Sequence, residues 1–382
     1  MTSLGIIIGV TSVILLTSIG NGLKNYISNQ FESLGSNLVY VAPGKIFDDK
    51  GRFSNGGGGH FITTSFTQDD ISVLKRGLKN TIVFPANQNP VEIKYKNTKK
   101  NTTLVGTTVE FGKYRNFLPS ENNGRWFTNE ENDKKSEVVV LGYQIAQDVF
   151  GDINPLNKKI IINGNNLKVI GIVDKKGSSF GGPDLDSFVF IPIKVSNRIV
   201  GNDHIQTISI WAENKEDISN IKEEAKKILL SQNYDKEAFS VFDSSQLLSS
   251  INTIITALTV ALTGIAAISL VVGGIGIMNI MLVTVSERTK EIGLRKAIGA
   301  NPNAILLQFL IEAVILSCLG GLIGILLGAL GTFAISKFFP AQITLSSILL
   351  AFGVSSAVGI IFGVAPARKA SKLSPIEALR YE

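Results

Sequence analysis

Two long apolar segments of the chain are separated by the sequence SERTKEIGLRKAIGANP, residues 286–302. Six charged residues lie within 287–296, a density that lipid does not tolerate. Opposite charges recur at three- and four-residue spacings, which puts them on one helix face: Glu287 with Lys290, Arg288 with Glu291, and Glu291 with Arg295. We therefore expect a short charged helix outside the membrane, between two membrane-spanning helices.

The residues that follow this charged run mark its end. Gly299 is suited to stop a helix, and Asn301 with Pro302 is typical of a cap and first turn of the next one. The simplest interpretation of the charges is a solvated loop that only sets membrane topology. The alternative is a helix that binds a partner.

The composition indicates a membrane protein. The 382 residues are 45% hydrophobic and 18% charged, with a mean hydropathy of +0.25, which is too apolar for a purely soluble chain. The net charge is +6, but no Lys/Arg cluster with interleaved aromatic residues occurs, so we expect no nucleic-acid partner. Cys318 is the single cysteine, which excludes an intrachain disulfide and a cysteine-based metal site.

Four segments are apolar enough to cross a bilayer, which takes about 20 residues per helix. They are residues 4–20, part of 244–286, 303–336 and 345–367. The first segment also admits a signal-peptide interpretation, although no small-residue cleavage site follows it. Apolar residues continue at helical spacing from Leu23 to Leu34, so we expect the first helix to extend outward as a stalk that ends at Gly35. The polar early part of 244–286 predicts a second stalk.

Basic residues near the membrane ends predict the orientation. They gather in the loop at Arg288, Lys290, Arg295 and Lys296, and in the tail at Arg368, Lys369, Lys372 and Arg380. The loop between the last two spans has Lys337 alone. Cytoplasmic segments carry the excess of Lys and Arg. Both termini are therefore expected on the cytoplasmic side of the cell membrane, and the segment from about 21 to 250 on the extracytoplasmic side.

The inserted segment shows strand patterns mixed with helical ones, which predicts an α+β domain. The expected strands are 37–42, 81–86, 91–95, 102–109, 138–141, 159–162, 167–173, 187–193, 205–212 and 239–242, of which 159–162 and 167–173 form a hairpin. The expected helices lie near 67–78, 143–150 and 216–230. The fold class is thus an α-helical membrane protein with four transmembrane helices and a large α+β extracytoplasmic domain between helices 1 and 2.

The predicted organisation has eight parts. They are residues 1–34 for the first span and stalk, 35–243 for the extracytoplasmic domain, 244–286 for the second stalk and span, 287–301 for the charged helix, 302–337 for the third span, 338–344 for a short outer loop, 345–367 for the fourth span and 368–382 for a cytoplasmic tail.

Small residues and one carboxylate mark the apolar segments. Faces of glycine let helices approach closely, for packing or dimerisation: Gly273, Gly274, Gly276, Gly320, Gly321, Gly324 and Gly328. Glu312 is either a proton-relay candidate or, being close to the cytoplasmic side, a partner of another helix.

Outside the spans, the sequence predicts no enzyme. Gly56 to His60 indicates a mobile loop more than a metal or phosphate site, and His204 is the only other histidine. No catalytic, metal-binding or cofactor-binding constellation is recognisable, and no Gly-x-x-x-x-Gly-Lys-Ser/Thr phosphate loop occurs. Trp126 and Trp211 are expected to serve packing.

Four motifs together resemble the permease part of MacB-type ABC transporters, within the FtsX-like permeases. They are residues 4–14, the pattern 138–142 with 150–151 and 167–173, the charged motif 287–300, and the C-terminal pattern 366–370 with 375–380. Members of this family usually carry a basic cytoplasmic segment before the first span, and this chain, which starts at Met1 close to the membrane, departs from that pattern.

The resemblance implies that the charged motif is a coupling helix that docks on a cytoplasmic ATPase dimer. Its contact residues would be Glu287, Arg288, Lys290, Glu291, Ile292, Arg295, Lys296, Ala297 and Gly299. It further implies a separate ATPase subunit that uses ATP and Mg, a homodimer of this chain, and an extracytoplasmic adaptor of the membrane fusion protein type. The chain itself would bind no cofactor.

Two functions follow from the resemblance. The first is export of amphipathic substrates such as antimicrobial peptides, antibiotics or lipoproteins, driven by motion transmitted across the membrane. The second is regulation of an extracytoplasmic cell-wall hydrolase without transport. A membrane receptor is a third class, but no signalling domain is recognisable in the sequence.

Overall fold

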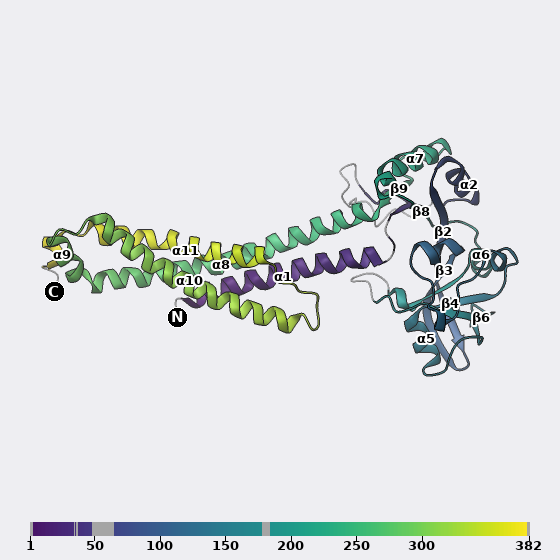
Figure 1. The fold of residues 1–382 in the computed structure, drawn as a ribbon, viewed down its shortest axis with the longest axis horizontal. Helices are drawn as coiled ribbons and strands as arrows, with labels where there is room; N and C mark the ends of the chain where they lie inside the picture. The colour runs from purple at the N-terminus through teal and green to yellow at the C-terminus, as the bar shows by residue number, and fades with distance from the viewer. Residues whose placement is uncertain (1–2, 34, 36, 48–64, 178–183, 380–382) are drawn as a thin grey trace. The chain divides into compact units, whose positions relative to one another are not determined.

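The computed structural model describes residues 3–33, 35, 37–47, 65–177 and 184–379, and the predicted loop Gly56 to His60 lies outside them. The chain divides into two compact units. We call residues 1–26 with 252–382 the helical unit, and residues 27–251 the sheet unit (Figure 1).

The helical unit contains the four predicted spans, each within one continuous helix. These are α1 (Ser3–Ser33), α8 (Ser244–Glu287), α10 (Pro302–Ile335) and α11 (Leu345–Lys372), all long and apolar enough to cross a membrane. Two short helices, α9 (Thr289–Ala297) and α12 (Pro375–Leu379), complete the unit. Helices α1 and α8 run beyond the expected spans, as the stalk predictions required.

Helix α11 continues beyond the predicted fourth span, through Pro366 to Lys372, and so includes the first residues of the predicted tail. Ala367 and Ala370 have no exposed surface, so their burial in the core of the helical unit holds this last part in helical form. A proline removes one helix hydrogen bond, and packing here outweighs that loss.

Glycines make the close helix contacts that their spacing predicted. A Cβ on Gly324 would lie 2.8 Å from the Val10 side chain, and one on Gly328 would lie 2.8 Å from that of Ile14, both on α1. The other contacts are equally tight: Gly273 meets the backbone of Gly5 and Ile6, Gly274 meets the Phe362 ring, and Gly321 meets Ser355, while Gly320 is buried and Gly276 half-buried. The five glycines with such contacts therefore pack helices within one chain.

The sheet unit is built on one nine-stranded sheet. Its strands are β1 (Leu38–Pro43), β2 (Thr81–Tyr95), β3 (Thr98–Thr107), β4 (Val138–Leu141), β5 (Lys159–Ile162), β6 (Asn165–Ile172), β7 (Phe188–Pro192), β8 (Thr207–Ala212) and β9 (Phe239–Asp243). Their order is β3-β7-β4-β6-β5-β2-β8-β1-β9, and β3 also pairs with β2. The pairing from β2 through β3, β7, β4, β6 and β5 therefore closes on itself, and β8, β1 and β9 extend it.

Strand β2 corrects one expectation, since the sequence predicted two strands there. Its first part pairs with β8 and its second part with β3, so one strand serves both regions of the sheet. The polar residues between the two parts caused the error. Asn87 is buried, accepts a hydrogen bond from the Gln206 N–H at 2.9 Å and donates one to Asn197 at 3.3 Å.

Helices cover the sheet. They are α2 (Gln68–Gly77), α3 (Val109–Tyr114), α4 (Asn129–Asp133), α5 (Tyr143–Phe150), α6 (Ile193–Val200) and α7 (Ile218–Ser231), with short 3₁₀ turns at Glu121–Asn123, Leu185–Ser187 and Lys215–Asp217. The predictions for α2, α5 and α7 are confirmed, whereas the sequence analysis did not predict α3, α4 and α6. Trp126 packs on Phe127 at 4.9 Å and Trp211 on Tyr114 at 4.5 Å between ring centroids, as their packing role predicted.

An ion pair joins α7 to the end of β9. Lys222 Nζ donates to the Asp243 carboxylate at 2.6 Å. Burial raises the pKa of Asp243, but the hydrogen bond and charge of Lys222, together with hydrogen bonds from Ser245 and the backbone, hold the pKa below its usual value. The carboxylate therefore stabilises the folded unit above the pKa of an unfolded aspartate, about 3.9, and this contribution is lost as pH falls through the folded pKa.

Replacing Lys222 by Met should lower the free energy of unfolding of the sheet unit by about 2 kcal/mol at neutral pH, because Asp243 loses its cation. The difference should shrink below about pH 4, where the carboxyl is protonated. Both tryptophans of the chain lie in this unit, so Trp fluorescence during urea unfolding of the full chain reports it alone. Lys226→Met, an exposed position on the same helix, is the control; equal losses in both variants would contradict the assignment.

Gly324→Val should destabilise the helical unit by about 1–3 kcal/mol, because the new side chain overlaps Val10 of α1. The measurement is the melting temperature by circular dichroism in detergent. Gly264→Val is the matched control, since a Cβ at Gly264 of α8 has no neighbour within 4 Å. A melting temperature equal to that of the control would show that the contact is not needed.

Candidate functional site

The charged motif folds as the end of α8, a break, and the short helix α9. Helix α8 runs to Glu287, and the break falls at Arg288, whose φ is −93° and ψ 13°. Thr289 Oγ1 donates to the carbonyl oxygens of Val285 at 3.0 Å and Ser286 at 2.8 Å across the bend. The predicted helix from Glu287 therefore starts two residues later, at Thr289.

The predicted end of this helix is confirmed. Gly299 has a φ of 100°, in the left-handed region that glycine adopts without strain, and the Ala300 N–H donates to the Arg295 carbonyl at 3.0 Å. The Asn301 side chain accepts from the Asn303 N–H at 2.9 Å and caps α10. The chain thus reverses from α8 to α10 over one short helix.

The ion pairs of the motif differ in part from those expected. Arg295 binds Glu291 at 2.5 Å, as predicted, and also donates to Gln308 at 2.7 Å. Arg288 pairs with Glu312 of α10 at 3.5 Å, so the predicted pair with Glu291 is wrong and Glu312 has the helix partner that one of its two interpretations required. Within the described residues, Glu287 and Lys290 make no ion pair.

One face of α9 is used inside the chain. Ile292 is only 3% exposed and belongs to the core of the helical unit, so its side chain is not free to enter a groove on a partner. A Cβ on Gly293 would lie 2.6 Å from Ala378 of α12. Lys296 Nζ donates to the carbonyl oxygens of Ser371 at 2.6 Å and Leu373 at 2.7 Å. Lys296 therefore joins α9 to the C-terminal end of α11.

The other face of α9 is exposed. These predicted contact residues are exposed here: Lys290, Glu291, Arg295 and Ala297 on α9, Glu287 and Arg288 just before it, and Gly299 just after it. Three apolar side chains lie among them that sequence reasoning did not single out: Leu294 is 57% exposed, Ile298 81% and Ile376 of α12 74%. Leu294 and Ile298 follow Glu291 and Arg295 at helical spacing, which was the available signal. We call these ten residues the coupling surface; it lies at the end of the helical unit where the C-terminus is marked (Figure 1).

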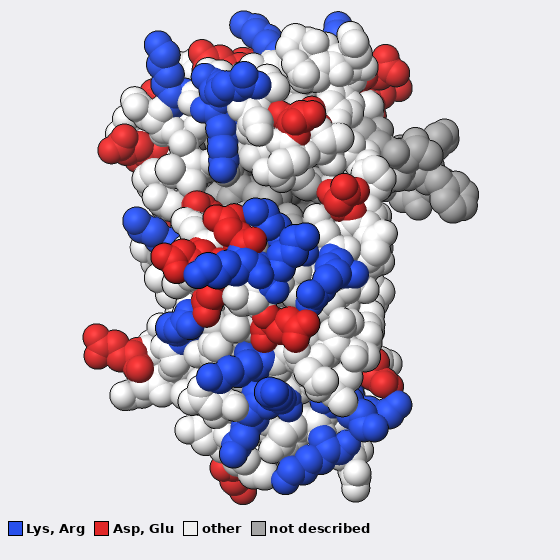
Figure 2. All heavy atoms as spheres, turned by 90° about the vertical axis from the view of Figure 1, so that its right-hand side faces the viewer, with Lys and Arg blue, Asp and Glu red and all other residues white. Residues whose placement is uncertain are grey.

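The strongest polar clusters of the sheet unit cap helices. Tyr234 donates to Asp70 at 2.7 Å, and burial together with Asp70 raises the pKa of the tyrosine, while Asp70 also closes the capping box of α2 with Thr67. Arg125 holds the pKa of Glu131 below its usual value and joins the cap of α4. No group of three metal-ligating side chains occurs among the described residues. Basic and acidic side chains are interspersed over the face of this unit seen in Figure 2.

Comparison with known proteins identifies both parts of the chain. Residues 1–228 match the MacB-like periplasmic core domain, and residues 263–375 match the FtsX-like permease C-terminal region. The macrolide export ATP-binding/permease protein MacB of Bdellovibrio bacteriovorus is 38% identical over all of this chain, and that of Wolinella succinogenes 36%. The chain spans 59% and 58% of the lengths of these relatives.

A solved periplasmic region of MacB from Actinobacillus actinomycetemcomitans also overlaps the chain. The overlap covers 59% of this chain and 97% of that one, with 19% identity and a TM-score of 0.48. A likeness of this size carries no argument about function.

Lys296→Met should loosen the attachment of α12 to α9. The variant loses the two hydrogen bonds to the carbonyl oxygens of Ser371 and Leu373, which lie just before α12. We expect the backbone amides of residues 374–379 to exchange with deuterium at least about tenfold faster. Lys290→Met, on the same helix but exposed and without an ion pair in the described part of the chain, is the control. Unchanged exchange in the Lys296 variant would mean that Gly293 and Ala378 hold α12 by packing alone.

Proposed function

Because this chain belongs to the MacB-type family of FtsX-like permeases, we propose that it transmits ATP-driven motion across the cell membrane to export amphipathic substrates. The observation that carries the proposal is the coupling surface, which exposes charges of both signs and large apolar side chains at the reversal between two membrane-grade helices. Ile298 is exposed beside Glu291 and Arg295. This combination is suited to binding a protein, since interfaces combine an apolar centre with a polar rim. A solvated loop requires no exposed isoleucine.

The partner is a cytoplasmic ATPase that docks on the coupling surface. These 382 residues contain no phosphate-binding loop, so we expect nucleotide and Mg to be bound by an ATPase that works with this permease. The relatives are named as ATP-binding/permease proteins and are longer than this chain, which supports an ATPase working with this permease. Both termini of the chain are then cytoplasmic, and the sheet unit is extracytoplasmic.

The moving part is helix α8. It is continuous over 44 residues, which is roughly 66 Å at about 1.5 Å per residue and about twice the hydrocarbon thickness of a bilayer. A helix satisfies its own backbone hydrogen bonds, so it can shift in lipid without exposing polar groups. Closure of the ATPase dimer on ATP would move α9, and α8 would carry this motion to the sheet unit.

Assembly and cargo complete the proposal. Two copies of the chain would pair so that each presents one coupling surface to the ATPase dimer, and an adaptor of the membrane fusion type would receive the cargo outside the membrane. The relatives are named for macrolide export, which favours export over the alternative of a cell-wall hydrolase regulator. Macrolides are therefore the first cargo to test.

Glu291→Lys should weaken binding of the partner ATPase about tenfold or more and uncouple ATP turnover from macrolide export, because the surface loses an acid and the Glu291–Arg295 pair. The double variant Glu291→Lys with Arg295→Glu restores an internal pair with reversed charges. We expect it to remain uncoupled, since the partner meets the wrong sign at both positions.

The measurements are co-purification of the ATPase with the full chain and macrolide accumulation in cells. Leu118→Asp, which puts a charge at an exposed apolar position of the sheet unit, controls for general loss of solubility or folding. Full recovery in the double variant would show that these two charges only pair with each other, and would remove them from the docking contacts.

A further inference from the structure

The basic residues at the cytoplasmic end of the helical unit fall into two groups. In the charged motif, Arg288 pairs with Glu312, Arg295 with Glu291, and Lys296 binds two backbone carbonyls. On α11, the exposed side chains of Arg368, Lys369 and Lys372 have no ion pair or hydrogen bond with any described residue. Membrane topology requires basic residues but not unpaired ones, so the charges on α11 are available to a ligand.

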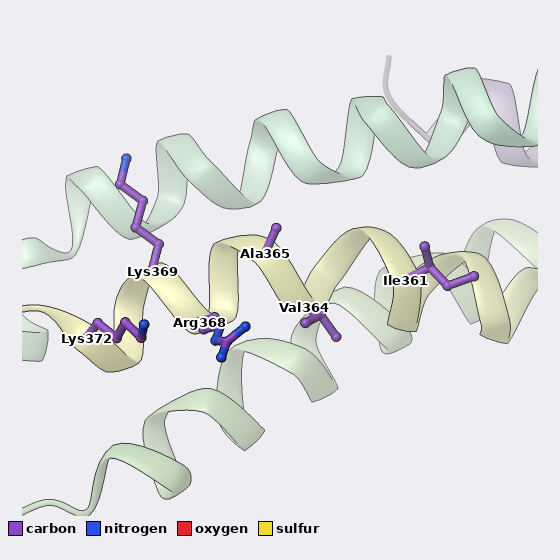
Figure 3. Close-up of a pocket in the computed structure, with 6 residues that line it drawn as sticks. All are labelled: Ile361, Val364, Ala365, Arg368, Lys369 and Lys372. Carbon is purple, nitrogen blue, oxygen red and sulfur yellow. The ribbon is translucent and has the colours of Figure 1, made fainter.

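These three cations continue an apolar surface on the same helix. Together with the exposed Ile361, Val364 and Ala365, they line an open pocket of about 510 Å³. In Figure 3, Ile361 and Val364 lie on the N-terminal side of the three basic side chains along α11. None of the described residues that line the pocket is acidic. A complementary ligand therefore carries negative charge at one end and hydrocarbon at the other.

The position of the pocket along α11 indicates whether that ligand is a membrane lipid or a free anion. At about 1.5 Å per residue, Ile361 lies roughly 24 Å and Arg368 roughly 35 Å from the start of the helix at Leu345. A hydrocarbon core about 30 Å thick thus reaches Ile361, while Arg368, Lys369 and Lys372 lie at the depth of the inner headgroups. A free phosphate would use the cations and leave the apolar part of the pocket empty.

We propose that this pocket binds one anionic phospholipid of the inner leaflet, with its phosphate at Arg368, Lys369 and Lys372 and its acyl chains along Ile361 and Val364. Arginine and lysine clusters at this depth attract anionic headgroups, and arginine binds phosphate through two donors. The inference rests on the proposed topology, in which α11 spans the membrane with its C-terminal end on the cytoplasmic side; it does not depend on the ATPase partner or on the cargo.

The test uses the full chain in nanodiscs of about four parts phosphatidylcholine to one part phosphatidylglycerol. After purification in neutral detergent, mass spectrometry counts the lipids that remain bound. We expect phosphatidylglycerol to be enriched over phosphatidylcholine on the unchanged protein. The variant Arg368→Gln, Lys369→Gln, Lys372→Gln should lose about fivefold in enrichment per charge, roughly 100-fold in all.

A control variant, Lys135→Gln, Lys158→Gln, Lys159→Gln, removes the same net charge from exposed, unpaired positions of the sheet unit and should keep the enrichment. Lys372→Gln alone, with about a fivefold effect expected, serves if the triple variant does not fold. Inorganic phosphate added at excess should not displace the lipid, because it cannot use Ile361 and Val364.

Three results would overturn the proposal. Equal enrichment in the triple variant and the control would place the lipid elsewhere. Full displacement by inorganic phosphate would make the pocket an anion site without lipid preference. Unchanged lipid with loss of the co-purified ATPase would assign this face to the protein partner, a result that leaves the coupling surface in place.

Discussion

The structure of the helical unit depends on one constraint, the cost of placing ionic groups in lipid. Six charges between two apolar helices force the chain to leave the membrane after α8 and to return as α10. The reversal is short, so α9 lies directly between the two helices. Ile292 packs α9 into the core of the helical unit, and Gly293 packs it against Ala378 of α12. The coupling surface, on the other side of α9, is exposed as a consequence of this anchoring.

Close helix packing makes that anchoring effective. Glycines on α8 and α10 bring these helices into backbone contact with α1, where any larger side chain would overlap. In lipid, where apolar surface gains little by association, such close contacts and a few interhelical hydrogen bonds hold helices together. Thr11 Oγ1, for example, donates to the carbonyl oxygen of Gly324 at 3.0 Å. A motion applied at α9 would therefore act on a closely packed group of helices.

The basic residues near α9 and at the C-terminal end of α11 differ in whether they have partners within the chain. Arg288 and Lys296 bind groups of the same chain and fix the reversal in place, although the sequence gives them the same appearance as their neighbours. Arg368, Lys369 and Lys372 stand free among the described residues, beside hydrocarbon-facing side chains. The same residue types are thus paired within the chain near α9 and unpaired among the described residues on α11.

The sequence by itself determined the features that depend on local pattern. The four apolar helices, the stop at Gly299, the cap at Asn301 and most strands follow from hydropathy, period and backbone preference, which act over a few residues. The sequence did not show that β2 is one strand, since the buried Asn87 in its polar middle hydrogen-bonds to Gln206 and Asn197, more than a hundred residues away. Nor did it show that Ile292 faces inward while Ile298 faces outward. Only the tertiary structure decided these points, because burial and ion pairing depend on which distant residues a side chain meets.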